Sequence, residues 1–198
     1  MAKQQLSQAK KGAKKIFYEV SAPITATKIQ LYASSAEELE GRVIKLDLTK
    51  SLKGKSLELR LRIKKDGDKL SAEPEYIELA GSYVRRGLRR GTDYVEDSFE
   101  AECRDFIIKI KPFMITRRRV SRAVLKALRE TARKNLEAYV KTRTAQEIFS
   151  DIITNKIQKQ LSAKLKTVYP LALCEIRMFH LVKEKPKEQK APLEPKVA

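Results

Sequence analysis

The spacing of apolar residues changes about half-way along the chain. Before Pro112, apolar residues recur at every second position, a period that is typical of β-strands with one buried face. After Arg117 they recur at every third or fourth position, which is the period of an amphipathic helix. The sequence therefore predicts a β-rich segment over residues 16–112 and a helical segment over residues 116–168.

The clearest predicted strand is the run from Leu57 to Ile63, where leucines and isoleucine alternate with charged residues. Lys65-Asp66-Gly67-Asp68 follows, and Asp-Gly is a strong hairpin signal. Shorter alternating stretches predict strands at residues 44–48 and 106–110, the second of them ended by Pro112, and residues 82–90 favour a short helix. Several short strands of this kind predict a mainly antiparallel sheet, either open or closed into a small barrel.

The helical half contains two long apolar stripes. Residues 117–141 hold no Gly or Pro. A second helix is expected from Thr144, where Thr144-Ala145-Gln146-Glu147 has the form of a capping box, with a break near Asn155 and an end at Pro170. Residues 171–182 alternate again and predict a strand that returns to the sheet. The expected fold is α+β: a sheet or barrel core flanked by two or three C-terminal helices, with a final strand.

The two ends of the chain differ from the part between them. Residues 1–15 carry five lysines and no acid, which predicts a flexible basic arm. Residues 183–198 hold three prolines among lysines and glutamates and predict a disordered tail. A single domain is therefore expected over residues 16–182.

The 198-residue chain carries a formal net charge of +18, from 43 Lys and Arg against 25 Asp and Glu. Self-repulsion of this size favours a polyanionic partner, although secreted and membrane-surface proteins share such a composition. The N-terminus lacks the apolar stretch of a secretory signal, and no run approaches the roughly 18 apolar residues of a membrane span. Cys103 and Cys174 stand far apart and are expected to be buried free thiols. We therefore expect a cytosolic protein.

Arginines gather in two clusters with few acids among them. Residues 104–134 hold eleven Lys or Arg against two acids, a net of +9, and the run Arg117-Arg118-Arg119 is followed by Arg122, Lys126, Arg129 and Arg133 at helical spacing. Guanidinium groups bind phosphate oxygens in pairs, and the low aromatic content of 7% favours contacts to the RNA backbone over base reading. The predicted RNA contacts are Lys3, Lys10, Lys11, Lys14, Lys15, Tyr83, Arg85, Arg86, Arg89, Arg90, Lys111, Arg117, Arg118, Arg119 and Arg122.

The sequence offers little for catalysis. His180 is the single histidine, and it is expected to be structural because it shares a predicted strand face with Ile176 and Met178. No catalytic residue, metal site or cofactor is predicted. An RNA-modifying or RNA-cleaving enzyme is the least favoured reading.

Several short motifs resemble, in order, the archaeal and eukaryotic small-subunit ribosomal protein family called eS-one (older name S-three-A-e). The opening Lys15-Ile16-Phe17-Tyr18-Glu19-Val20-Ser21-Ala22-Pro23 is similar to the family's K-x-W-Y-x-V-x-A-P, with Phe17 in place of the usual Trp. The later matches are Gly41-Arg42-Val43, Leu46-Asp47-Leu48, Ser82 to Arg86 with Arg89-Arg90, Lys109 to Pro112 with Thr116 to Arg119, and Val168 to Leu171 with Glu175-Ile176-Arg177. Residues 102–105 depart from the family, which usually has a Gly-containing hairpin there.

The resemblance implies a structural constituent of the small ribosomal subunit, in the cytoplasm and bound to the ribosome. It places the chain on the subunit platform near the mRNA exit side. The implied partners are the 3′ region of the small-subunit rRNA and neighbouring platform proteins, with mRNA as a further candidate and no membrane. The short chain suits an archaeal member. A transient RNA-binding translation or RNA-processing factor is the alternative.

Overall fold

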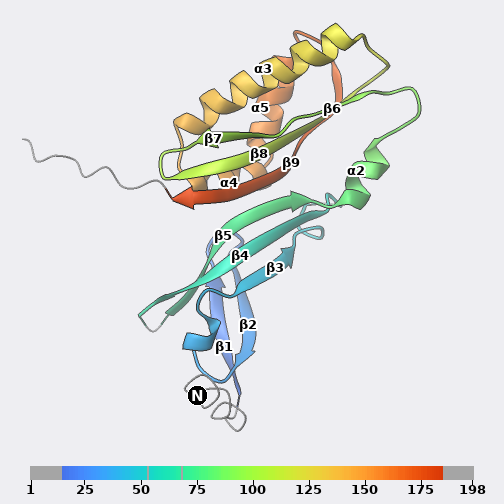
Figure 1. Cartoon of the computed structure of the whole chain (residues 1–198). Coiled ribbons are helices and arrows are strands. Elements are labelled where there is room, and N and C mark those ends of the chain that lie inside the picture. The colour runs from blue at the N-terminus through green and yellow to red at the C-terminus, as the bar shows by residue number, and fades with distance from the viewer. Residues whose placement is uncertain (1–14, 53, 68, 185–198) are drawn as a thin grey trace, which may run out of the picture. The chain divides into compact units, whose positions relative to one another are not determined.

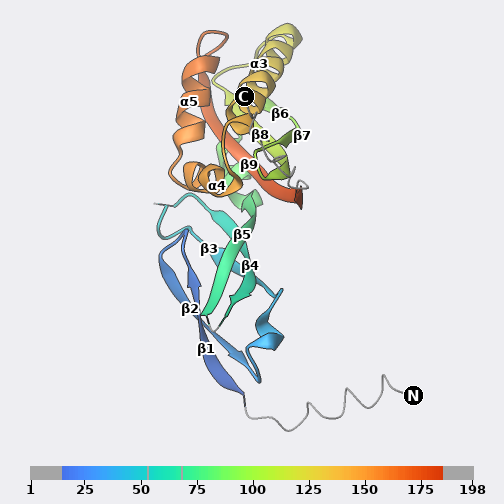
Figure 2. The same cartoon turned by 90° about the vertical axis from the view of Figure 1, so that its left-hand side faces the viewer.

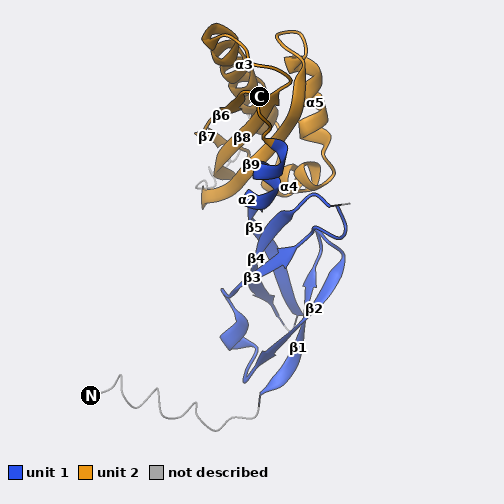
Figure 3. Ribbon diagram, turned by 90° about the vertical axis from the view of Figure 1, so that its right-hand side faces the viewer, with its two compact units in different colours: residues 1–87 blue, residues 88–198 orange. Residues whose placement is uncertain are grey.

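The computed structural model describes residues 15–52, 54–67 and 69–184. The chain divides into two compact units, residues 1–87 and residues 88–198 (Figure 3). The single domain expected over residues 16–182 stays a prediction, because compactness does not report cooperative folding. Most of the predicted arm, residues 1–14, and the predicted tail from residue 185 lie outside the described residues.

Unit 1 is a five-stranded sheet. Its elements are β1 (Ile16–Ala22), β2 (Thr27–Ala33), the 3₁₀ turn η1 (Glu37–Leu39), β3 (Val43–Asp47), β4 (Leu57–Asp66), β5 (Lys69–Leu79) and the short helix α2 (Gly81–Gly87). The strand order is β2-β1-β5-β4-β3, antiparallel except for a short parallel pairing of β1 with β5. No described residue pairs β2 with β3, so this sheet is open rather than closed into a barrel.

The β4–β5 hairpin confirms the predicted strand and turn. Gly67 follows β4 with a φ of 62°, which glycine adopts without steric strain, and Asp66 pairs with Lys69 across the turn. The four alternating apolar side chains of β4, from Leu57 to Ile63, are buried. On the charged face, Arg62 and Lys64 of β4 form ion pairs with two glutamates of β5, so this face is solvated and internally neutralised.

Unit 2 is built around one long strand. Its strands are β6 (Tyr94–Glu96), β7 (Phe99–Glu102), β8 (Phe106–Thr116) and β9 (Leu171–Glu184), and its helices are α3 (Arg122–Lys141), α4 (Ala145–Ile153) and α5 (Lys156–Leu165). Strand β8 pairs with β9 on one side and with β6 and β7 on the other, always antiparallel. The predicted α+β class with C-terminal helices and a final strand is confirmed.

The three helices of unit 2 form one layer on the sheet (Figures 1 and 2). Helix α3 packs on β6 and β7, α5 packs on β9 and on α3, and α4 packs on α5. The buried stripe of α3, including Leu128 and Leu136, faces inward. Phe149 of α4 and Phe179 of β9 meet edge to face with ring centroids 4.7 Å apart, which fixes α4 against the sheet.

Several predicted boundaries in unit 2 are wrong. Helix α5 ends at Leu165 rather than at Pro170, and β9 continues to Glu184, two residues into the predicted tail. Pro112 does not end its strand: β8 continues to Thr116, and the pairing with β9 shifts register between Lys111 and Pro112, the irregularity that a proline in a strand favours. Helix α3 begins at Arg122 rather than Arg117, because residues 117–121 form the connection from β8. The break expected near Asn155 is confirmed, with α4 ending before it and α5 starting after it.

Candidate nucleic-acid interface

The arginine run 117–119 lies in the connection between β8 and α3, and hydrogen bonds at its base hold that connection. Thr116 is fully buried, and its Oγ1 accepts from the Asp93 N–H at 3.0 Å and lies 2.8 Å from the Arg118 carbonyl oxygen. The Asp93 carboxylate accepts from the Val120 N–H at 2.9 Å. These bonds fix the backbone while Arg117, Arg118 and Arg119 are exposed. The three guanidinium groups therefore extend into solvent from a loop whose backbone is fixed by hydrogen bonds.

The start of α3 has an unusual distribution of charge. A helix N-terminus carries the positive end of the helix dipole, so acidic residues and a capping side chain are normally favoured there. The first turn of α3 holds no acid, begins with the exposed Arg122 and follows the arginine run, while the N-cap Ser121 makes no capping hydrogen bond with its side chain. Four cations and the positive end of a helix therefore meet in one short segment, which is suited to an anion.

The basic stripe predicted along α3 exists but is partly neutralised. Lys126 lies 3.9 Å from the Glu130 carboxylate, and the Nε of Arg133 donates to Glu137 at 2.8 Å. Hydrogen bonding to Glu137 raises the pKa of the Arg133 guanidinium. Arg129 is exposed with no ion pair recorded among the described residues. The stripe thus offers fewer uncompensated cations than its sequence indicates.

The second arginine cluster falls around α2. In that helix Val84 is buried, Arg85 and Arg86 are exposed, and the Arg86 guanidinium lies 5.7 Å from the centre of the half-buried Tyr83 ring. Arg89 and Arg90 are also exposed but follow the helix, in a turn that Thr92 closes by donating to the Arg89 carbonyl at 2.8 Å. All four arginines are accessible.

The remaining predicted contacts are scattered. Lys15 is exposed beside β1, with its Nζ 5.8 Å from the Tyr32 ring centre. Lys111 is half-buried in the middle of β8, five residues and about 16 Å along the strand from Thr116, so it does not join the arginine run. Lys3, Lys10, Lys11 and Lys14 lie outside the described residues.

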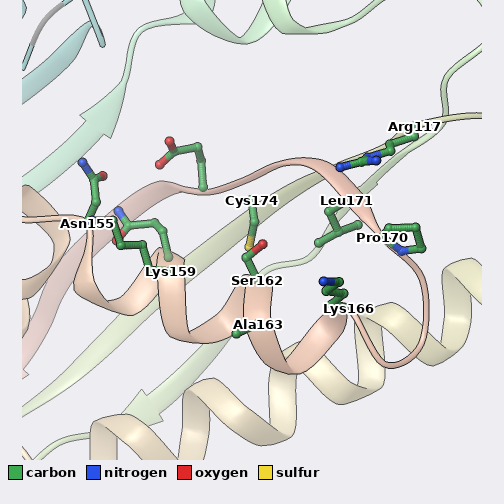
Figure 4. A pocket seen from close by; sticks show the side chains of 11 residues that line it. Arg117, Asn155, Lys159, Ser162, Ala163, Lys166, Pro170, Leu171 and Cys174 are labelled. Atoms are coloured by element: carbon green, nitrogen blue, oxygen red, sulfur yellow. The ribbon is translucent and has the colours of Figure 1, made fainter.

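A groove that the sequence did not predict lies between α5 and the start of β9 (Figure 4). Arg117 and Lys166 lie toward the end that holds Pro170, while Asn155 and Lys159 lie toward the other end, and Ser162 and Cys174 lie between them. Burial raises the pKa of the Cys174 thiol to about 12, with Glu175 adding to the effect, so this thiol is not a nucleophile at neutral pH.

One sequence signal could have found this groove. Residues 152–174 carry Lys156, Lys159, Lys164 and Lys166 and no acid at all. That imbalance matches the one that marks the arginine clusters, but the lysines are spread over a helix and do not stand out as a run. Gln158, which also lines the groove, has no sequence signal of its own.

Metal-ligating side chains are dispersed over the described part of the chain. No three His, Cys, Asp or Glu side chains gather there as metal ligands. His180 is half-buried on β9, opposite Lys109 of β8. Over the same residues, the helices are too short or too polar to cross a bilayer.

The exposed, braced arginine loop at the start of α3 combines guanidinium groups with free backbone N–H groups, which are the donors that an anion needs. Comparison with known families adds the identity of the chain. The model of the ribosomal S3Ae family matches residues 3–185. The chain belongs to the ribosomal S3Ae family.

Curated archaeal relatives agree with this assignment. The chain is 26% identical over 176 residues to the small ribosomal subunit protein eS1 of Nanoarchaeum equitans, which covers 85% of the chain and 89% of the relative. It is 28% identical over 184 residues to the eS1 protein of Halorubrum lacusprofundi, covering 88% of the chain and 85% of the relative. With the eS1 protein of Methanothermobacter thermautotrophicus it shares 31% identity over 103 residues, about half of each protein.

Membership of the S3Ae family makes the chain a ribosomal protein with archaeal-like sequence, and the resemblance found in its motifs is confirmed. The family is structural rather than enzymatic, and it implies a cytoplasmic, ribosome-bound protein. The family does not assign RNA contacts to individual residues, so the arginine clusters stay predictions.

Proposed function

We propose that this S3Ae-family chain is a structural constituent of the small ribosomal subunit. In this proposal the connection between β8 and α3 binds rRNA phosphates. The relatives are named as small-subunit proteins, which supports the choice of subunit. The observation that carries the proposal is the set of four exposed arginines, 117–119 and 122, at the uncapped start of α3.

This arrangement is unfavourable without an anion. A cation beside a helix N-terminus opposes the dipole by about 0.3–1 kcal/mol, and neighbouring arginines also repel one another. A phosphate that binds there accepts hydrogen bonds from guanidinium groups and from backbone N–H groups at once. The bound RNA therefore relieves a strain that the isolated chain carries.

The finer contacts belong to the same proposal. The second arginine cluster, Arg85, Arg86, Arg89 and Arg90, together with Tyr83 and the lysines 3, 10, 11, 14, 15 and 111, adds further phosphate contacts. The family resemblance supports a position on the platform near the mRNA exit side, with contacts to the 3′ region of the rRNA, to neighbouring platform proteins and to mRNA. Cross-linking within assembled subunits tests that position, and cross-links confined to the 5′ region of the rRNA would contradict it.

The salt dependence of RNA binding tests the arginine run. Each phosphate contact contributes about 0.7–0.9 to the slope of log K against log salt, so Arg117→Ala with Arg118→Ala and Arg119→Ala should flatten the slope by about 2 to 3. Binding of a structured rRNA fragment is measured by fluorescence anisotropy at several salt concentrations, with circular dichroism to verify the fold.

A matched triple variant removes the same charge from ion-paired positions. Lys28, Arg62 and Lys64 are exposed, and each lies within 4.0 Å of a glutamate carboxylate, at 3.5, 2.7 and 2.6 Å respectively. Replacing these three by Ala lowers the net charge by the same amount but should change the slope by less than 1. Equal slopes for the two triple variants would show that only total charge matters and would remove the arginine run from the interface.

A further inference from the structure

The groove between α5 and β9 is lined by polar side chains, most of which have no role in the proposed phosphate binding by the arginine run. Its volume is about 620 Å³, within the range of small-ligand pockets. Its three cations, Arg117, Lys159 and Lys166, are exposed and lie at both ends, as Figure 4 shows. Arg117 also belongs to the arginine run, so the groove continues directly from the proposed phosphate-binding loop.

One buried atom of the groove lacks a partner. Gln158 is only 4% exposed, and its Nε2 donates to the Ile152 carbonyl oxygen at 3.1 Å. That bond fixes the orientation of the amide, because the oxygen in its place would face another oxygen. The Oε1 is buried and has no hydrogen-bond partner in the structure. A buried acceptor left unpaired lowers stability, so a donor from a ligand is strongly favoured at this position.

The polar lining therefore has two kinds of group. Cations stand at its two ends, whereas the buried Gln158 and Glu175 side chains contribute oxygen acceptors. An inorganic anion fits the cations but not the buried acceptors, which repel it. A ligand with a negative group for the ends and a neutral N–H or O–H donor for the interior matches both. A nucleotide has this combination, with its phosphate and either a base amino group or the ribose 2′-hydroxyl.

We propose that this groove holds one unpaired nucleotide of single-stranded RNA, with its flanking phosphates on Arg117, Lys159 and Lys166 and a base or ribose donor on Gln158 Oε1. This inference rests on the proposed function, since Arg117 leads the strand from the rRNA-binding loop into the groove. Cations at both ends suit successive phosphates of a continuing strand better than the single phosphate group of a mononucleotide. Base pairing occupies the amino donors of a duplex, and stacking between paired neighbours keeps a single nucleotide from entering a groove, so an unpaired nucleotide is favoured with either donor.

The test uses the full chain and compares two probes of equal length, an unstructured single-stranded RNA and a perfect RNA duplex. The variant is Gln158→Met, which removes the acceptor, keeps an unbranched side chain of similar size and changes no charge. The control is Gln160→Met, because Gln160 is exposed on the same helix and does not line the groove. Affinities are measured by fluorescence anisotropy at fixed salt.

We expect Gln158→Met to weaken single-strand binding roughly 3- to 10-fold, the effect of one lost hydrogen bond, and to leave duplex binding and the salt slope unchanged. Gln160→Met should match the wild type with both probes. Single-strand affinity of Gln158→Met equal to that of Gln160→Met would overturn the proposal. An equal loss with both probes would also overturn it, because the groove would then not distinguish unpaired RNA.

A second variant keeps the test decisive if Gln158→Met disturbs the fold. Ser162 is half-buried between Lys159 and Lys166, and Ser162→Leu should fill the groove from the helix side and give the same selective loss. Competition with adenosine or cytidine monophosphate identifies the source of the ligand. Displacement of the single strand by either mononucleotide at comparable concentration would overturn the RNA assignment in favour of a small-molecule site.

Failure of this inference is distinguishable from failure of the proposed function. If the Arg117–Arg119 triple variant flattens the salt slope while Gln158→Met has no effect, rRNA binding stands and the nucleotide groove is wrong. If the wild-type chain binds neither probe, both are wrong.

Discussion

The buried Asp151 carboxylate has three side-chain partners. It is 5% exposed and accepts from the Tyr139 hydroxyl at 2.8 Å and from Arg143, with Lys156 Nζ 3.5 Å from its other oxygen. The Arg143 guanidinium also lies 4.2 Å from the Tyr139 ring centre. This network joins α3, the following turn and both shorter helices around one buried charge.

Asp151→Ala should lower the free energy of unfolding by about 1–3 kcal/mol, because several donors lose a shared acceptor that is shielded from water. Urea denaturation measures the change. Glu130→Ala removes an exposed carboxylate from a 3.9 Å pair on α3 and should change stability by less than about 0.5 kcal/mol. Equal effects of the two substitutions would show that the network contributes nothing beyond a surface ion pair.

The same network makes stability depend on pH. Burial, followed by the hydrogen bond to Asp151, raises the pKa of Tyr139 to about 12, above its ordinary value of 10.0. Below pH 10 the hydroxyl keeps its proton in both the folded and the unfolded chain, so the contribution is complete. Between pH 10 and 12 the unfolded chain ionises first, so the contribution of this group to stability should be lost as the pH rises through that range.

Tyr139→Phe isolates that contribution. The variant lacks the ionising hydroxyl, so its stability should fall less steeply between pH 10 and 12 than that of the wild type, while Tyr76, whose pKa burial also raises to about 12, titrates in both. Urea midpoints at pH 9, 10, 11 and 12 supply the comparison. Parallel curves for the two proteins would contradict the assignment.

At the scale of single residues, the sequence predicted which arginines are exposed but not which of them form ion pairs. Runs such as Arg117 to Arg119 have no acid within reach along the chain, which composition alone reveals. Lys126 and Arg133 each stand four residues before a glutamate, and this i,i+4 spacing on a predicted helix could have indicated their neutralisation. Gln158 could not be predicted, because an unpaired buried oxygen is a consequence of packing rather than of residue type.

At the scale of elements, hydrogen bonds of the Thr116 side chain fix the connection between β8 and α3. The hydroxyl bonds to the Asp93 backbone and reaches the Arg118 carbonyl oxygen, so it links the arginine run to the residue directly before β6. Thr116→Val preserves shape and charge but removes these bonds. A looser connection positions the guanidinium groups less well for phosphate.

Thr116→Val should weaken binding of the rRNA fragment about two- to fivefold with an unchanged salt slope, since no charge is lost. Fluorescence anisotropy measures it, and Thr167→Val, at an exposed threonine after α5, is the control. An affinity equal to that of the control would indicate that the arginine run does not depend on a braced connection.

The spacing of apolar residues predicted the helices and strands that have a long regular pattern. It missed the strands whose pattern is short or irregular. The capping box at Thr144 is present, with Glu147 N–H bonded to the threonine and the Glu147 carboxylate bonded to the Thr144 N–H. Strand β1 was not predicted, because its apolar residues do not alternate with the buried face. Only Val20 and Ala22 are buried, while the apolar Ile16 and Phe17 are exposed. Strands β6 and β7 hold three and four residues, too few to show a period.

At the scale of the whole molecule, charge and composition indicated an RNA partner, and the ordered motifs indicated the family that the comparisons then showed. The division into two compact units was not predicted, because both halves have similar charge and no linker composition separates them. The boundary between the units falls inside the second arginine cluster, with Arg85 and Arg86 before it and Arg89 and Arg90 after it.

Sedimentation of a native lysate tests the central claim, that the chain is an integral constituent of the small ribosomal subunit. The protein is followed across the gradient before and after a high-salt wash of the subunit. We predict that it stays with the small subunit at close to one copy per subunit after the wash. Release into the free fraction would contradict the claim and favour a factor that visits the ribosome transiently.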